Sequence, residues 1–275
     1  MKKPNYKLLL PLLAVAASGC AKSASTPSVS SAFVMTGSSS PQTVAQHQKP
    51  SLLGLFLPKA TALAPSSMQD STGAAVTLSS AWVVIEQIEF KQDEGSDAGE
   101  LDGTEVEFNG PYVVNLLATT PQVLDTKTVP ALPYKRIKMK LHKASTLPAT
   151  APSQLAGNSI YLSGHVGANA FSYQADDTTH FDIGGPSAVL PSSGADLLVA
   201  ISLANVVRQI NLSTLPNSAV ISSSNKFPGS NLCPLIDASA SDVYTCLRKA
   251  LQTHANFGRD SHHGGDFDTD GGKVR

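Results

Sequence analysis

Residues 134–142 read YKRIKMKLH, and this stretch decides the fold class of the chain. Apolar Ile137, Met139 and Leu141 alternate with basic residues, so an extended strand would place one set on each of its faces. One apolar face and one charged face are typical of a strand in a half-buried antiparallel sheet. The stretch therefore predicts a strand with one side in a core and the other in water.

Strand patterns continue on both sides of this stretch. They cover residues 74–79, 81–91, 106–108, 112–117 and 123–129 before it, and 159–166, 170–174, 179–183 and 195–203 after it. In the second of these, Trp82, Val84, Ile88 and Phe90 share one parity, which predicts that they lie on one face. Many short strands separated by turn residues favour an antiparallel β-sandwich over residues 74–204. A β-barrel is the alternative.

One amphipathic helix is predicted near the C-terminus, over residues 241–254. Ser239 with Asp242 three residues later resembles a capping box, and apolar residues follow at helical spacing. Residues 205–257 are interpreted as a C-terminal extension that carries this helix. Residues 258–275 hold little that is apolar and are predicted to be disordered.

The N-terminus has the layout of an export signal. Three lysines precede an apolar run of about ten residues, 8–17, well short of the roughly 20 that a spanning helix needs. Residues 17–20 read ASGC and resemble a lipobox, whose cysteine is acylated and becomes the first residue of the mature protein. The resemblance predicts a signal peptide over 1–19, a lipidated Cys20 and attachment to a membrane. No aspartate follows Cys20, and by analogy with the sorting of such lipoproteins this favours the outer membrane of a bacterial cell envelope over the inner one.

Residues 20–73 are predicted to be a flexible tether between the lipid and the domain. Segment 21–51 is rich in Ser, Thr, Pro and Gln, so it lacks the apolar surface that folding requires. The short apolar segment 52–57 is interpreted either as docking on the domain or as a second contact with the membrane surface.

Two cysteines remain once Cys20 is assigned to the lipid. Cys233 and Cys246 are close in sequence in an exported protein, which predicts a disulfide. The loop it closes has a size for which the chain-entropy model gives about 3 kcal/mol. Two buried free thiols are the alternative.

Composition narrows the function classes. The net charge is −1 over 275 residues, so there is no basic excess to favour a nucleic-acid partner. The sequence contains no Gly-x-Ser-x-Gly elbow, phosphate loop or His-Glu-x-x-His motif. A non-catalytic role is therefore favoured.

Two groups of residues have side chains of the types that can bind metals. Residues 266–271 read DFDTDG, and Asp266, Asp268 and Asp270 match the first half of a calcium loop, although the acid expected at loop position 12 is missing. Calcium is thus the one cofactor that the sequence suggests, and His262 and His263 beside these acids would suit a transition metal. A second set, His165, His180 and Asp182, would form a metal site if their strands are neighbours.

The order of strands resembles that of bacterial lipoproteins that carry a prealbumin-like or immunoglobulin-like sandwich of unknown function. The matching motifs are Trp82-Val83-Val84-Ile85 with Ile88, Val114-Asn115-Leu116-Leu117, Tyr134-Lys135-Arg136-Ile137, Gly164-His165-Val166 and Ala195-Asp196-Leu197. The similarity covers roughly residues 74–204. Residues 130–133, Pro-Ala-Leu-Pro, depart from the family's Pro-Ala-Gly, and the terminal helix lies outside its pattern. The resemblance implies a fold and no activity.

Two functions of different classes follow. The first is a lipid-anchored envelope protein that presents a β-sandwich for non-catalytic binding of a protein or a glycan. The second is a metal-dependent hydrolase that uses His165, His180 and Asp182. The distance between those three side chains separates the two, because ligands of one ion lie near 2 Å from it.

Overall fold

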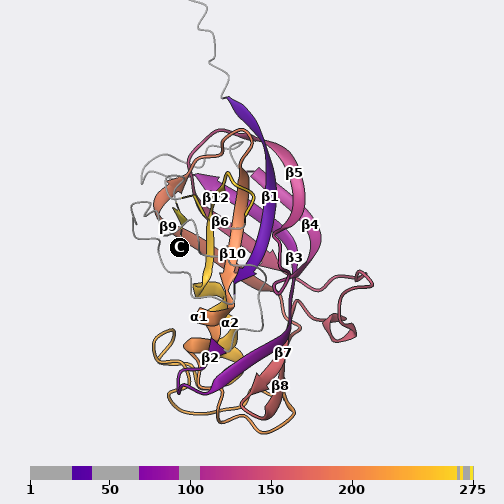
Figure 1. Cartoon of the computed structure of the whole chain (residues 1–275), viewed down its shortest axis with the longest axis vertical. Helices are drawn as coiled ribbons and strands as arrows, with labels where there is room; N and C mark the ends of the chain where they lie inside the picture. The colour runs from indigo at the N-terminus through magenta and orange to yellow at the C-terminus, as the bar shows by residue number, and fades with distance from the viewer. Residues whose placement is uncertain (1–26, 39–67, 93–105, 265–266, 269–272, 275) are drawn as a thin grey trace, which may run out of the picture.

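The computed structural model describes residues 27–38, 68–92, 106–264, 267–268 and 273–274. Within them the protein is mainly β, as predicted, and its strands form two sheets (Figure 1). One sheet has five strands in the order β13-β12-β10-β1-β5, and the other has eight. Nine strand pairs are antiparallel, as predicted, and two, β1 with β10 and β11 with β8, are parallel, so the predicted antiparallel arrangement is wrong for these two.

The five-stranded sheet collects segments from distant parts of the chain. Its strands are β1 (Ser28–Ser38), β5 (Gln122–Pro130), β10 (Asp196–Ser202), β12 (Ala255–Asp260) and β13 (Lys273–Val274). β1 lies between β5 and β10, and β10 lies between β1 and β12. Every residue of β10 is buried, because both faces of this central strand are covered.

The eight-stranded sheet is organised around one long strand, β3. Its members are β2 (Met68–Gln69), β3 (Ala75–Gln92), β4 (Val106–Asn115), β6 (Tyr134–Leu141), β7 (Ile160–Val166), β8 (Asn169–Ala175), β9 (Thr179–Val189) and β11 (Ala219–Ile221). β4 pairs with one edge of β3. On the other edge β7 pairs with the first half of β3 and β6 with the second half. β7 and β6 therefore follow one another along β3.

A β-bulge in β3 changes which of its side chains face the core. The register shifts between Ile85 and Gln87 against both β4 and β6. Val83 before the bulge and Phe90 after it join the main core, whereas Val84 packs in a small cluster on the opposite face. The prediction of a single face for Trp82, Val84, Ile88 and Phe90 is wrong, because one extra residue reverses the parity.

An aromatic cluster joins the two sheets. The ring of Phe33 in β1 lies 5.9 Å from that of Phe90 in β3 and 5.4 Å from that of Phe108 in β4. Phe257 in β12 lies 5.2 Å from Phe90. The cluster places the centre of the core between the sheets.

The strand β1 lies inside the segment predicted to be a tether, and the prediction is wrong for residues 28–38. Phe33 and Met35 are 0 % exposed. The segment folds because β5 and β10 supply its backbone partners, which its own composition does not reveal. The signal segment, Cys20, the rest of the tether and segment 52–57 lie outside the described residues.

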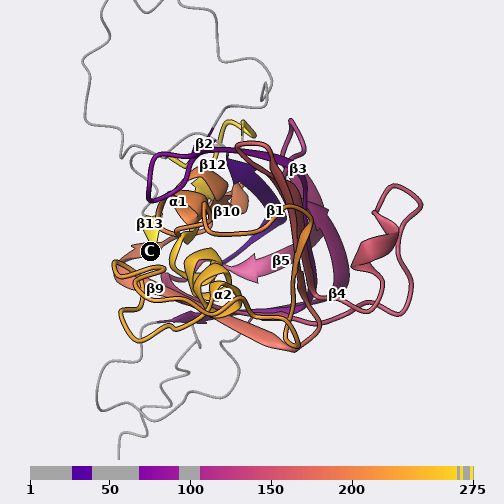
Figure 2. The ribbon, with the colours of Figure 1, turned by 90° about the horizontal axis from the view of Figure 1, so that it is seen from below.

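The chain also forms two α-helices, α1 (Leu203–Arg208) and α2 (Val243–Thr253), and a 3₁₀ turn over Ser153–Leu155. α2 confirms the predicted helix, although its N-cap is Asp242 and not Ser239: the Asp242 carboxylate accepts a hydrogen bond from the Thr245 amide at 2.7 Å. α1 was not predicted, because its apolar residues continue the pattern of β10. Both helices lie inside the outline of the sheets in Figure 2. None of the described helices is both long and apolar enough to cross a membrane.

Residues 258–264 and 267–268 belong to the segment predicted to be disordered, and for them the prediction is wrong. β12 continues to Asp260 and pairs with β10, and the amide of Asp268 donates to the carbonyl of Arg259 at 2.7 Å. The predicted disulfide is present: Cys233 and Cys246 are joined by an S–S bond of 2.03 Å. It holds α2 to the loop before it.

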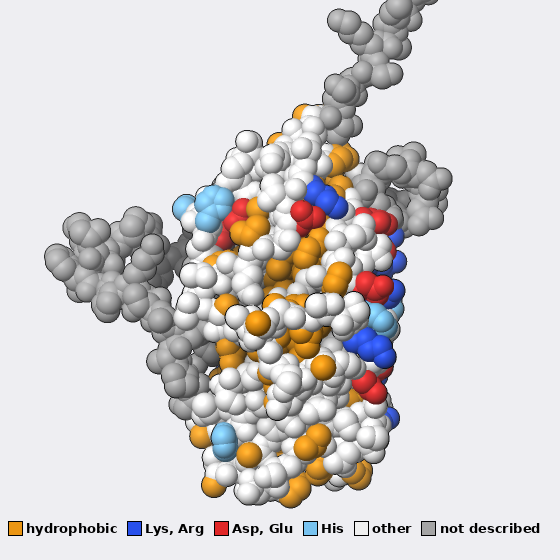
Figure 3. All heavy atoms as spheres, turned by 90° about the vertical axis from the view of Figure 1, so that its right-hand side faces the viewer, with side chains coloured by type: hydrophobic (Ala, Val, Ile, Leu, Met, Phe, Trp, Pro, Cys, Tyr) orange, Lys and Arg blue, Asp and Glu red, His pale blue; other side chains and the backbone are white. Residues whose placement is uncertain are grey.

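Charged side chains are unevenly spread over the face of the molecule that Figure 3 shows. Figure 3 shows acidic and basic groups interspersed along one margin of the face, with hydrophobic side chains down its middle. On the outer face of the eight-stranded sheet, Arg136 pairs with Asp182 at 2.6 Å and Lys140 with Glu86 at 2.8 Å. Arg136 and Lys140, two of the basic residues in the stretch 134–142, are thus paired with acids on neighbouring strands.

Candidate functional site

The structure separates the three residues predicted to share a metal ion. His165 in β7 is level with Thr77 of β3, and His180 in β9 is level with Lys140, which is itself opposite Gln87. Thr77 and Gln87 are ten positions apart along β3, which is roughly 33 Å of extended strand. Asp182 is engaged by Arg136 through two hydrogen bonds of 2.7 and 2.6 Å. The predicted site is wrong because β7 and β6 follow one another along β3 and are not neighbours.

A different group of potential metal ligands lies where β12 ends. Asp260, His262 and Asp268 each offer one ligand atom, and these atoms lie within 4.8 Å of one another. Asp260 is 1 % exposed, and the side chain of Asp268 is 2 % exposed, whereas that of His262 is 88 % exposed. The two carboxylates of the group are therefore buried, and its histidine lies at the surface. Among the described residues it is the one cluster of three such side chains.

Asp268 is fixed by the turn around it. Its Oδ1 accepts hydrogen bonds from the amide and the hydroxyl of Ser261 at 3.0 and 2.9 Å, and its Oδ2 accepts from Nε of Arg259 at 2.7 Å. Burial opposes the charge of Asp268, but the bonds from Ser261 and Arg259 outweigh it and lower the pKa of this carboxyl. Asp268 is therefore an anion at neutral pH.

His263, the residue after His262, contacts a different carboxylate. Nδ1 of His263 lies 2.7 Å from Oδ2 of Asp196, the first residue of β10. This hydrogen bond and the charge of Asp196 raise the pKa of His263. Asp196 is also the backbone partner of Asp260. The pairing of β10 with β12 brings the start of β10 beside the end of β12. This pairing therefore places Asp196 next to the group formed by Asp260, His262 and Asp268.

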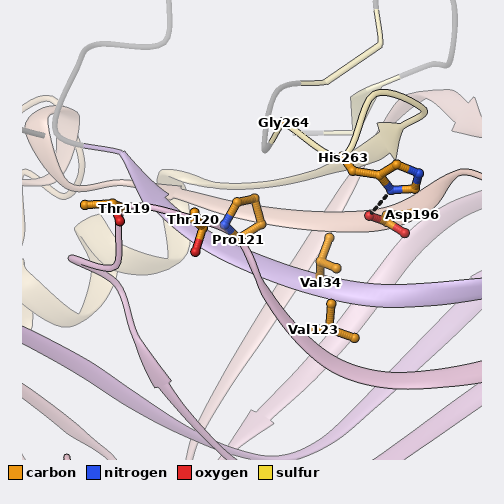
Figure 4. Close-up of a pocket in the computed structure, with 8 residues that line it drawn as sticks. All are labelled: Val34, Thr119, Thr120, Pro121, Val123, Asp196, His263 and Gly264. Carbon is orange, nitrogen blue, oxygen red and sulfur yellow. Dashed lines mark hydrogen bonds and ion pairs between the residues drawn. The ribbon is translucent and has the colours of Figure 1, made fainter. Parts of the chain in front are cut away.

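An open cavity of about 470 Å³ lies beside this contact (Figure 4). Its apolar lining comes from Val34 in β1 and from Pro121 and Val123 around the start of β5. The remaining lining residues are Thr119, Thr120, Asp196, His263 and Gly264. Nδ1 of His263 faces Asp196, so Nε2 is the ring nitrogen that Asp196 does not engage.

Sequence reasoning found only part of this site. It noted His262, His263 and Asp268, but Asp196 stands far away in the chain, and its one signal is a lone carboxylate at the start of an apolar run. Asp266 and Asp270 of the predicted calcium loop lie outside the described residues, so that loop stays a prediction. Cys20 does too.

No protein-family model, curated protein or solved structure matches the chain, so the geometry of the site is the basis for its interpretation.

Proposed function

We propose that this chain is a lipid-anchored protein of the bacterial cell envelope, held at the outer membrane, that binds a partner without catalysis. The anchoring half of the proposal is supported by the lipobox-like residues 17–20 after a short apolar run. The binding half rests on one observation, the open cavity beside His263 on the five-stranded sheet. A protein loop or a glycan at the envelope would place apolar atoms against Pro121 and Val123 and a polar group against His263.

The fold that presents this cavity is, in this proposal, a β-sandwich of the prealbumin-like or immunoglobulin-like kind. Two observations support it. The sheets share one aromatic core in which Phe33 faces Phe90 and Phe108, and sandwich sheets pack through interdigitating inner faces of this type. The motif order of residues 74–204 is the second. A barrel closed by hydrogen bonds is the competing arrangement.

Site-specific crosslinking in intact cells tests the binding role. A photoreactive amino acid replaces Val123, which lines the cavity and is 65 % exposed, or, as the matched control, Leu235, which is 83 % exposed elsewhere. We expect an adduct of defined mass from the first position only. Equal yields from both positions, or none from Val123, would contradict a ligand at this cavity.

Anchoring is tested separately with Cys20→Ser. The wild-type chain should incorporate labelled palmitate and float with membranes, whereas the variant should do neither. Wild-type protein that lacks acyl chains by intact mass would refute the lipid anchor and leave the crosslinking result standing.

A second candidate function is the binding of a divalent cation by Asp260, His262 and Asp268. The ligand atoms lie within 4.8 Å of one another. Two ligands that are each about 2.1 Å from an ion are at most about 4.2 Å apart, so the exposed side chain of His262 has to move inward by a few tenths of an ångström to complete the site. One imidazole and two carboxylates suit Zn²⁺ better than Ca²⁺, which prefers six or more oxygens.

Titration calorimetry with Zn²⁺ tests this candidate on the purified soluble chain. His262→Ala should weaken binding about tenfold or more, whereas His165→Ala, a change of an exposed histidine in the other sheet, should not. Binding that is unaffected by His262→Ala would refute the site.

A further inference from the structure

One end of the domain is fixed to the start of the described chain. We call it the β1 end; it comprises Pro27, the first residues of β1 and the last residues of β5. Ser28 is level with Pro130, and the amide of Ala131 donates to the carbonyl of Pro27 at 2.8 Å. The backbone is therefore held in place from Pro27 onward.

The opposite end is formed by the turn between β7 and β8, at Gly167 and Ala168. We call it the hairpin end. Figure 1 shows β1 beginning at the top of the molecule and the β7–β8 hairpin at the bottom, beyond the last residue of β1. β1 alone has 11 residues, or roughly 36 Å of extended strand. The two ends are therefore separated by more than the length of β1.

Only six residues, 21–26, lie between Cys20 and Pro27. A chain of this length spans at most roughly 25 Å, at about 3.6 Å per residue. The early start of β1 replaces the long tether expected from sequence with a link shorter than the domain. A protein that carries acyl chains on Cys20 must keep Pro27 within that distance of the bilayer surface.

From this we propose that the β1 end of the domain faces the bilayer that holds the lipid, and that the hairpin end points away from it. The inference rests on the proposed lipidation of Cys20. It identifies the partner of the β1 end as a lipid surface, and it places the candidate site in the membrane-proximal half. Asp196 adjoins Leu197, the partner of Phe33, so the site lies along β1 only about 13 Å from Ser28, at about 3.3 Å per residue.

The surface chemistry of the β1 end indicates how the contact arises. Its most exposed residues on β1, on β5 and in the segment after β5 are uncharged: Pro27, Ser28, Ser30, Thr126, Thr128 and Pro133. The charged residues beside them, Lys127 and Asp125, are of opposite sign and lie 3.8 Å apart. Such a surface meets lipid headgroups without the attraction of a basic patch. The short link sets the orientation, so the orientation should persist at high salt, where electrostatic docking is screened.

Energy transfer from single dyes to the membrane tests the orientation. A cysteine replaces Thr128 at the β1 end or Ala168 at the hairpin end; both residues are exposed, and Cys233 and Cys246 are bonded to each other and do not compete for dye. The acylated full chain is placed in vesicles of phosphatidylethanolamine and phosphatidylglycerol that contain a trace of headgroup-labelled acceptor. We expect severalfold more transfer from residue 128 than from residue 168.

A linker insertion is the matched control. About 30 Gly and Ser residues placed after Lys22 give a flexible reach of roughly 30 Å, so the difference between the two dyes should shrink strongly. Equal transfer from both positions of the acylated chain, or more from residue 168, would overturn the orientation while leaving the lipid anchor in place. A chain without acyl groups by intact mass would overturn both, and this measurement on the same sample separates the two failures.

Discussion

The two sheets of this protein differ in how their strands come together. In the eight-stranded sheet three of the seven pairings join consecutive strands, β2 with β3, β3 with β4, and β7 with β8 through the turn at Gly167. In the five-stranded sheet, β1 finds its partner β10 more than 160 positions away: Phe33 is level with Leu197. The candidate site belongs to this second sheet. Local pairing thus built the part that sequence patterns describe well, and long-range pairing built the part that carries the site.

Removing the aromatic ring that joins the two sheets should have the largest effect on stability. Phe33→Ala should lower the free energy of unfolding by about 3–5 kcal/mol, because the ring is fully buried and leaves a cavity. Urea denaturation measures the loss. Val123→Ala, at an exposed position of the neighbouring strand, is the control and should change stability by less than about 0.5 kcal/mol. A neutral Phe33→Ala would mean that residues 28–38 are a tether after all.

A carboxylate that ties distant segments together gives the next largest effect. Asp70 accepts three hydrogen bonds within its own turn, from the amide and hydroxyl of Thr72 and the amide of Ala74. It also accepts two from the amides of Leu212 and Ser213, at 3.0 Å each.

Asp70→Asn turns one acceptor into a donor that faces amide groups, so it should cost about 2 kcal/mol in unfolding free energy. Thermal unfolding measures it. Asp182→Asn, at an exposed position of the same sheet, serves as the control. A loss no larger than that of the control would show that the link between the β2–β3 turn and residues 212–213 is unimportant.

The pH dependence of stability tests the residues next to the five-stranded sheet. His254 ends α2, and its carbonyl accepts from the Ser202 amide at 3.0 Å. Burial lowers the pKa of His254 below 6.5, so the folded state binds its proton less tightly than the unfolded state does. Stability should therefore be greatest above pH about 6.5 and fall as the pH drops through the unfolded value.

The measurement compares wild type with His254→Gln in urea at several pH values between about 5 and 8, a range that brackets the ordinary histidine pKa. The variant should lose less stability on acidification than the wild type. Parallel curves would show that His254 titrates alike in both states.

The smallest effect is expected on the outer face of the eight-stranded sheet. Arg136 and Asp182 form an ion pair at 2.6 Å, but their side chains are 51 % and 39 % exposed. A double-mutant cycle with Arg136→Ala and Asp182→Ala should give a coupling of about 0.5 kcal/mol that declines with added salt. A coupling above about 2 kcal/mol would show that this pair does more than neutralise the surface.

Particular elements show how far the sequence could be read. The strands at residues 134–142 and 159–174 follow from alternation and a turn signal, and they are present. α2 follows from helical spacing, although the nearer acid, Asp242, takes the cap. The face of β3 was misjudged because no residue pattern marks the bulge at Ile85 and Gln87.

The candidate site was only half visible for a similar reason. His262, His263 and Asp268 attract attention as a polar group near the C-terminus. Nothing in the chain says that Asp196 meets His263, because that contact depends on the pairing of β10 with β12. Conversely, the sequence suggested that His165 and His180 lie on neighbouring strands. They do not, because their strands lie at opposite ends of the long strand β3.

The sequence by itself determined the mainly-β class, the amphipathic helix α2 and the pairing of Cys233 with Cys246. Each of these follows from periodicity or counting within a short window. Only the tertiary structure decided that residues 28–38 are a central strand, that three carboxylates gather where β10 and β12 meet, and that the link to Cys20 is short. The physical reason is that a strand obtains half of its hydrogen bonds and most of its burial from partners, and the chain's local composition does not record where those partners are.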